Sequence, residues 1–189
     1  MELEYGLVEN ALDSLREAMN YYNEGDEEDN ANQYKFSILL SAHCVELLLK
    51  EILRRNHPAL LFENIDSVKD LQDDDNQTVG YKNAIQRVKK LCGVDLKQYE
   101  TYIDELGRVR NQIQHYKCSI NGEYHKQLMA KTFSAIEFIF RDILGLKFED
   151  YENIIEPADI DFYTRILQLI KQEKKILLRI LKKVKIGSG

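Results

Sequence analysis

Proline and glycine are scarce in this chain, which has two prolines and nine glycines among 189 residues. Both residue types interrupt regular structure, so their scarcity argues against short strands joined by many tight turns. Long helices in one domain are the expected alternative, and the chain is long enough to bury a sizeable core. The fold class that we predict is therefore all-α.

Cysteine and long apolar runs are also scarce. The three cysteines are Cys44, Cys92 and Cys118, an odd number without short spacing. This pattern argues against a disulfide framework or a zinc knuckle and fits a reducing compartment. We see neither a membrane span nor the apolar stretch of a signal peptide. A cytoplasmic protein that does not contact membranes is the expectation.

The net charge of −6 conceals an asymmetry between the two ends of the chain. Residues 158–189 hold eight Lys or Arg against three acids, a net +5, which leaves −11 for the remainder. An acidic body binds nucleic acid poorly, so any RNA contact needs a local basic site. The basic end could meet an acidic protein, RNA or anionic lipid, although a docked helix with solvated lysines is the simpler interpretation.

Apolar residues recur at helical spacing along most of the chain. The second segment is apolar around most of its circumference, so this helix should lie at the centre of the bundle. Helices are predicted over residues 3–22, 31–56, 81–91, 98–117, 124–144 and 158–186.

The segments between these helices are polar or irregular. Residues 23–30 form an acidic run with one glycine, where we expect a solvated loop. Residues 59–79 are long for a connection in a compact bundle, and their three consecutive aspartates suggest a solvated loop rather than a cation site. The predicted organisation is a helical bundle at 1–146, a linker at 147–157, an amphipathic basic helix at 158–186 and a linker-like Gly-Ser-Gly tail at 187–189.

The predicted helix 98–117 carries an arginine in an unusual place. On a helical wheel Arg110 falls inside the apolar stripe, whereas Asn111 and His115 share a polar face. An arginine that points toward a core needs a partner, because an unpaired buried charge is very costly. Glu46 is also a carboxylate within an apolar arc, on helix 31–56. The sequence therefore predicts an ion pair between Glu46 and Arg110.

Arg110 and His115 also offer a particular chemistry. An arginine supplies a fixed positive charge for a phosphate, and a histidine exchanges protons near neutral pH. The two side chains are about 140° apart on the wheel, so one helix does not bring both to the same phosphate. A site that two copies of the chain build together removes this difficulty.

Two features of the sequence resemble the HEPN domain family over about residues 1–146. One is the pattern Arg-Asn-x-x-x-His from Arg110 to His115, and the other is the segment Ser-Ala-His-Cys-Val-Glu-Leu-Leu-Leu-Lys at 41–50. The resemblance implies an up-and-down bundle of four to five helices that forms a homodimer, with both copies of the motif at one cleft. Family members with this motif are typically metal-independent endoribonucleases. Many are toxins or antiviral defence effectors, often paired with a neutralising protein partner.

The resemblance also implies roles for the residues of the motif. His115 would take the proton of the ribose 2′-hydroxyl or protonate the leaving 5′-oxygen, and a second copy of His115 would do the other. Arg110 would stabilise charge on the phosphate, and Asn111 would orient His115 or the phosphate. DNA would not be cut, because it lacks the attacking hydroxyl. This chemistry requires no metal or other cofactor, and no carboxylate cluster suggests one.

Several neighbouring residues have two interpretations. Arg108 is a second phosphate contact or, as we favour, a solvated charge. Tyr116 stacks on a base or, as we favour, is a core aromatic at the edge of the stripe. His43 and Lys50 share one face of helix 31–56, where a dimer seam could lie.

Two functions rival an endoribonuclease. The first is a non-catalytic helical module that dimerises or binds RNA, in which Arg110 and His115 serve the structure. The second is an adaptor or neutralising protein whose basic last helix binds an acidic partner.

Overall fold

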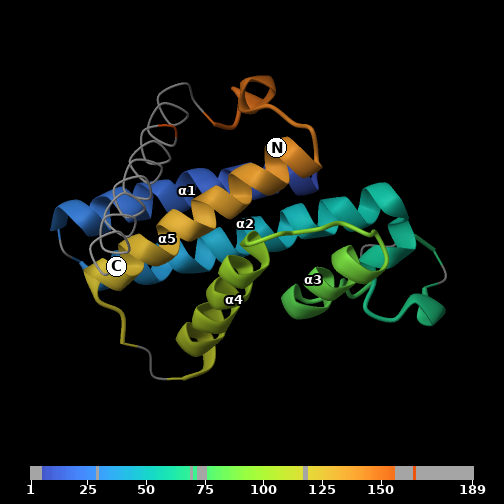
Figure 1. Cartoon of the computed structure of the whole chain (residues 1–189), viewed down its shortest axis with the longest axis horizontal. Helices are drawn as coiled ribbons and strands as arrows, with labels where there is room; N and C mark the ends of the chain where they lie inside the picture. The colour runs from blue at the N-terminus through green and yellow to red at the C-terminus, as the bar shows by residue number, and fades with distance from the viewer. Residues whose placement is uncertain are drawn as a thin grey trace, which may run out of the picture.

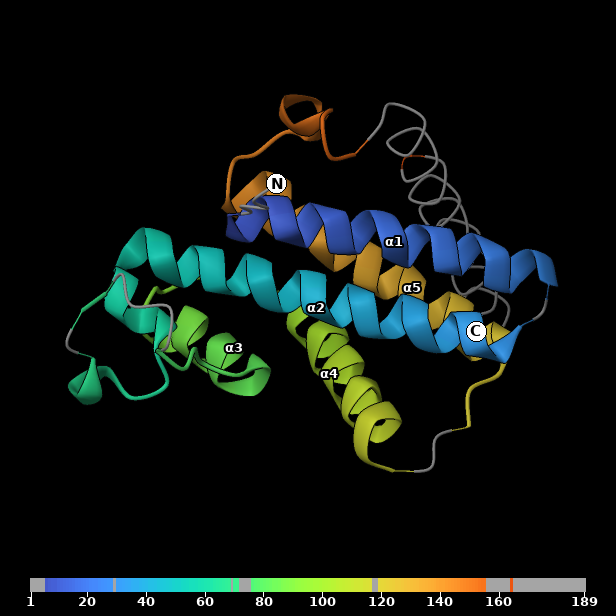
Figure 2. The same ribbon diagram turned by 180° about the vertical axis from the view of Figure 1, so that it is seen from behind.

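The computed structural model describes residues 6–28, 30–68, 70–71, 76–116, 119–155 and 164. Within these residues the protein is a bundle of five α-helices without a β-strand, which confirms the all-α prediction. In Figures 1 and 2, α1, α2 and α5 follow the long axis, and α4 crosses them steeply with its C-terminal end projecting beyond them. The helices are α1 (Leu7–Glu28), α2 (Ala31–Asn56), α3 (Tyr81–Lys90), α4 (Tyr99–His115) and α5 (Gly122–Glu137).

The central position predicted for helix 31–56 is confirmed. Helix α2 has these bounds and contacts every other α-helix of the described bundle. Its start is fixed by Asn30, whose side-chain oxygen accepts from the backbone N–H of Asn32 at 3.0 Å. Its end is fixed by the pair His57 and Pro58, because the residue before a proline is driven out of the helical conformation.

The loop predicted over residues 23–30 is wrong. Helix α1 continues through the acidic run to Glu28, and only a short link joins it to α2. Gly25, the apparent helix breaker, is buried and lies against Tyr34 of α2. A methyl group at Gly25 would lie 2.6 Å from the ring of Tyr34, so glycine lets the two helices approach closely.

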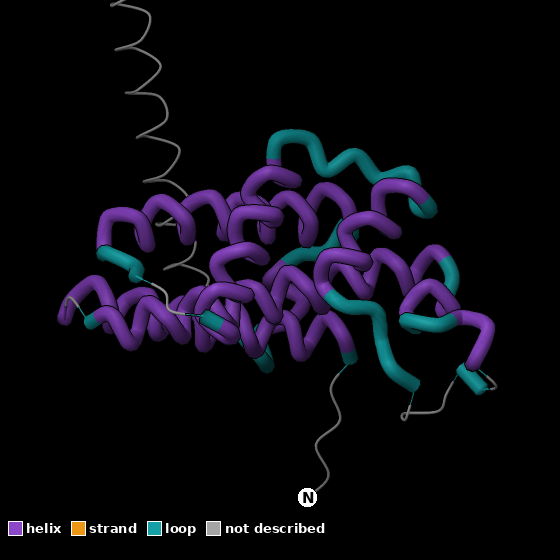
Figure 3. Tube along the Cα trace, turned by 90° about the horizontal axis from the view of Figure 1, so that it is seen from below, coloured by secondary structure: helices purple, strands orange, loops and turns teal. Residues whose placement is uncertain are grey.

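The connection after α2 is irregular, as predicted, but it is anchored. It contains two 3₁₀ turns, η1 (Pro58–Leu61) and η2 (Ile65–Ser67), and a bridge that pairs Phe62, between the two turns, with Thr78. Arg87 of α3 donates to the carbonyl oxygens of Leu60 and Phe62 at 2.8 and 2.6 Å. Thr78 is joined to α2 by Lys50, which donates to Thr78 Oγ1 at 3.0 Å. Figure 3 shows how the loops join the ends of the helices.

The end of the described chain departs from the predicted linker over 147–157. Helix α5 passes into a π-helical turn, η3 (Phe138–Ile143), and then a 3₁₀ turn, η4 (Phe148–Tyr151). Phe148, Ile154 and Ile155 are buried in the core, so the bundle extends beyond residue 146. Arg16 of α1 donates to the carbonyl oxygen of Ile154 at 2.8 Å.

Two further predictions concern residues near the end of the chain. Apart from residue 164, the predicted basic helix 158–186 and the tail 187–189 lie outside the described residues. None of the helices in the part of the chain described here is long and apolar enough to cross a membrane.

Candidate functional site

Helix α4 changes character along its length. Its first half is buried through Ile103, Leu106, Gly107 and Val109. Beyond Val109 the helix emerges from the bundle, and its last residue, His115, is exposed. The predicted polar face of Asn111 and His115 is thus at the surface. Arg108 is exposed as well, as the interpretation of a solvated charge expects.

Tyr116 does not belong to the core. The helix ends at His115, and the backbone of Tyr116 is extended, with φ −141° and ψ 174°. The chain therefore leaves the helix before the apolar stripe reaches Tyr116, and 77% of this residue is exposed. The interpretation of Tyr116 as a core aromatic is wrong, and its ring is available to a partner.

The ion pair predicted between Glu46 and Arg110 is also wrong. Glu46 instead pairs with Lys50 at 2.8 Å, and the Lys50 ammonium also donates to Thr78 Oγ1 at 3.0 Å. Lys50 lies one helical turn from Glu46 on α2 and so reaches this carboxylate locally. The only hydrogen bond of the Arg110 guanidinium within the described residues goes to Asn111 Oδ1, at 3.0 Å.

Arg110 nevertheless acts electrostatically on His43 of α2. Its charge and the charge of Glu46 both act on the pKa of His43 and on that of Tyr81. We call His43, Glu46, Lys50 and Arg110 the open cluster. It joins the middle of α2 to the second half of α4.

His43 is the member of the open cluster that sequence reasoning did not recognise as a candidate catalytic residue. Partial burial lowers the pKa of His43, the negative charge of Glu46 opposes this, and the positive charges of Lys50 and Arg110 lower it further. The imidazole is therefore mostly neutral at pH 7. The one signal in the sequence is the spacing of His43, Glu46 and Lys50, which places all three on one helix face.

A groove of about 810 Å³ separates the start of α3 from α4. Gly107 shapes it, because a methyl group there would lie 2.6 Å from the ring of Tyr81. The Tyr81 hydroxyl donates to the carbonyl oxygen of Ile103 at 2.9 Å, and burial raises the pKa of Tyr81, so it stays protonated. Four of the candidate residues predicted from the sequence line this groove, namely Arg108, Arg110, Asn111 and Tyr116. His115 does not line it.

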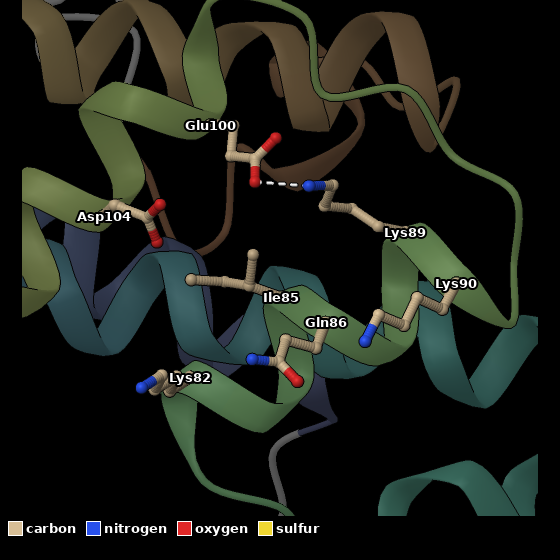
Figure 4. Close-up of a pocket in the computed structure, with 7 residues that line it drawn as sticks. All are labelled: Lys82, Ile85, Gln86, Lys89, Lys90, Glu100 and Asp104. Carbon is tan, nitrogen blue, oxygen red and sulfur yellow. Dashed lines mark hydrogen bonds and ion pairs between the residues drawn. The ribbon is translucent and has the colours of Figure 1, made fainter.

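A smaller hollow of about 270 Å³ lies on another side of the α3–α4 contact (Figure 4). Lys82 and Lys89 of α3 line this hollow together with Glu100 and Asp104 of α4. Lys89 pairs with Glu100 at 2.5 Å, so part of its positive charge is already compensated. Lys82 and Asp104 also line the larger groove, so what makes that groove better suited to a phosphate is its two arginines, Arg108 and Arg110.

A second group of charges lies near the end of α2, and we call Glu51, Arg54 and Arg55 the closed cluster. Glu51 is 2% exposed and accepts from Arg54 at 2.8 Å and from Arg55 at 2.7 Å. Arg55 also donates to the carbonyl oxygen of Leu144 at 2.7 Å. Burial by itself would raise the pKa of Glu51, but the bonds from both arginines lower it overall. The closed cluster therefore serves the fold.

Comparison with known proteins adds no relative: no family model, curated protein or solved structure matches the chain significantly.

Proposed function

We propose that the protein is a metal-independent endoribonuclease that cleaves RNA by attack of the ribose 2′-hydroxyl on the adjacent phosphate. The observation that carries the proposal is the state of Arg110. Within the described residues this guanidinium makes no ion pair, and it lines an open groove. A charge without a carboxylate partner, placed at a groove, is available to a phosphate, which arginine binds through two parallel hydrogen bonds.

The residues around Arg110 are better suited to bind a nucleotide than an inorganic anion. Tyr116 presents an exposed ring at the groove, and aromatic rings of this kind stack on unpaired bases. Arg108 adds a second positive charge for the RNA backbone. His115, exposed at the end of α4, provides a group that can exchange a proton with the 2′-hydroxyl or the leaving 5′-oxygen.

The same proposal includes a homodimer. Arg110 lines the groove and His115 does not, which is consistent with their separation of about 140° on the helix. A cleft between two copies would bring the arginine of one chain to the histidine of the other. The biological setting that we propose, from the HEPN resemblance alone, is a toxin or antiviral defence effector in the cytoplasm with a neutralising protein partner.

Cleavage of single-stranded RNA in the presence of EDTA tests the activity. We expect products that end in a 2′,3′-cyclic phosphate, no cleavage of DNA, and loss of cleavage in His115→Ala. Gln114→Ala is the matched control, because Gln114 is an exposed neighbour on the same turn. Absence of cleavage by the native chain, or full activity of His115→Ala, would disprove the proposal.

A second function is favoured by one observation, the exposed ring of Tyr116 beside two arginines of the groove. This surface also fits a module that binds single-stranded RNA without cutting it. Retention of RNA by the native chain, with the RNA intact after prolonged incubation, would identify the binding module.

A further inference from the structure

The hydroxyl of Ser14 makes two hydrogen bonds that together fix the state of His43. Ser14 Oγ lies 2.9 Å from the carbonyl oxygen of Asn10 and 2.9 Å from Nδ1 of His43. A carbonyl oxygen can only accept, and a hydroxyl has one proton to donate. If that proton goes to Asn10, Ser14 Oγ must accept from His43. Both bonds form together only when His43 Nδ1 carries a proton.

The other ring nitrogen of His43 is then a free base. In the neutral ring a proton on Nδ1 leaves a lone pair on Nε2. Among the described residues the ring makes no hydrogen bond besides the one to Ser14, and His43 is exposed. Ser14 is itself buried, so the bond anchors the ring while Nε2 remains accessible. The ring is thus oriented and unprotonated on the side away from α1.

The surroundings of His43 match those of a general base. Glu46 and Lys50 lie on the same face of α2, the positive charge of Arg110 on α4 acts on the imidazole, and the neutral Ser14 faces the ring from α1. Glu46 and Lys50 neutralise each other, which leaves Arg110 as the uncompensated charge beside the imidazole. A phosphate that Arg110 binds on the side of this imidazole would meet an unprotonated nitrogen of the same chain.

We propose that His43 is the general base of the reaction, acting through Nε2 on the ribose 2′-hydroxyl next to a phosphate that Arg110 binds. This inference rests on the proposed endoribonuclease function. His43 Nε2 takes the 2′-hydroxyl proton while the 2′-oxygen forms a bond to phosphorus. The bond from phosphorus to the 5′-oxygen breaks, and the 5′-oxygen takes a proton from protonated His115. One proton is gained by His43 and one is lost by His115, so the step balances.

His43→Asn tests the role without removing the anchor. The side-chain amide of asparagine can occupy the place of Nδ1 and donate to Ser14, but it supplies no base at the position of Nε2. In the full chain we expect kcat for RNA cleavage to fall about 100-fold or more, with KM nearly unchanged. His57→Asn is the matched control. His57 is exposed at the end of α2 and accepts from the backbone N–H of Ala59, as asparagine also can.

The pH profile separates catalysis from structure. The native chain should lose kcat/KM as the pH falls through the pKa of His43, below the ordinary histidine value of about 6.5, because the base becomes protonated. In His43→Asn this decline should disappear, since asparagine does not titrate. An independent ¹⁵N NMR spectrum of the histidine rings should show His43 protonated on Nδ1 at pH 7.5.

The outcomes distinguish this inference from the function on which it rests. If the native chain cleaves RNA, His115→Ala does not, and His43→Asn keeps both the rate and the pH profile, the role of His43 is disproved and the endoribonuclease stands. A proton on Nε2 instead of Nδ1 in the NMR spectrum also disproves the role. If the native chain does not cleave RNA, the proposed function fails and the role of His43 fails with it.

Discussion

The closed cluster lies entirely on α2, whereas the open cluster combines residues of α2 with Arg110 of α4, and only in the closed cluster is every charge paired. In the closed cluster the buried carboxylate of Glu51 receives bonds from two arginines, one of which also reaches a carbonyl of the chain beyond α5. In the open cluster Glu46 is satisfied by Lys50, and Arg110 has no carboxylate. A charge that the fold does not satisfy, beside a groove, is a better sign of function than the mere presence of charge.

The largest effect on RNA cleavage should come from substitution of Arg110, the residue of the open cluster that has no carboxylate partner. Arg110→Ala should lower kcat for RNA cleavage about 10³-fold, because transition-state charge on the phosphate loses its stabilising donor. The free energy of unfolding, measured by urea denaturation, should change by less than about 1 kcal/mol, since no buried partner is left behind. Strong destabilisation with unchanged cleavage would show that Arg110 serves the fold, as the closed cluster does, and does not take part in cleavage.

Glu51→Gln should have the opposite profile. Loss of the buried carboxylate should lower the free energy of unfolding by about 2 kcal/mol at pH 7 and leave cleavage unchanged. Because the pKa of Glu51 is lowered in the folded protein, its stabilisation is present above the unfolded value of about 4.3 and disappears as the pH falls through the folded value. The difference between native chain and variant should therefore shrink toward pH 3.

A matched acid controls the test of Glu51. Glu152→Gln also removes one carboxylate, but Glu152 is exposed, and its substitution should leave stability at pH 7 unchanged. Equal loss of stability in Glu152→Gln and Glu51→Gln would mean that the closed cluster contributes nothing specific.

Gly107→Ala tests the wall of the groove beside the open cluster. The added methyl group would meet the buried ring of Tyr81, so we expect a loss of about 1–2 kcal/mol in the free energy of unfolding. In a Tyr81→Ala background the same change should be stabilising by up to about 1 kcal/mol, because alanine is the better helix former. An identical effect in both backgrounds would show that Tyr81 does not account for the glycine.

Tyr116→Ala should have the smallest effect. RNA affinity, measured by fluorescence anisotropy in the His115→Ala background, should fall five- to tenfold, as about 1 kcal/mol of stacking is lost. Tyr116→Phe should keep the affinity, because the ring remains. Leu91→Ala is the control for an exposed apolar side chain outside the groove, and it should change nothing. Equal losses for Tyr116→Ala and Leu91→Ala would remove Tyr116 from the RNA-binding surface.

The sequence predicts α2 well and the end of α1 badly, for one physical reason. The bounds of α2 are set by local signals, namely the cap at Asn30 and the pair His57 and Pro58. Helix α1 continues past Gly25, where the glycine fits closely against the ring of Tyr34 on another helix. Local patterns therefore suffice where a helix ends on its own residues, and they fail where tertiary contact decides.

The same limit applies to the candidate site. The helical wheel places Arg110 within the apolar stripe, and the residue is half-buried in the structure, but the wheel does not show which partner its side chain reaches. Lys50 reaches Glu46 first because it lies four residues away on the same helix. His43 depends on Ser14, which is 29 residues distant, so no spacing rule would have joined them.

The π-helical turn η3 also fixes the number of residues that the chain needs between α5 and η4. Such a turn holds one residue more than an α-helical turn, and here it buries Phe138, Ile139 and Phe140 in succession. Phe140 then stacks on Phe148, with ring centroids 4.5 Å apart. Deleting a single codon within η3 would rotate everything that follows by about 100° and separate these two rings.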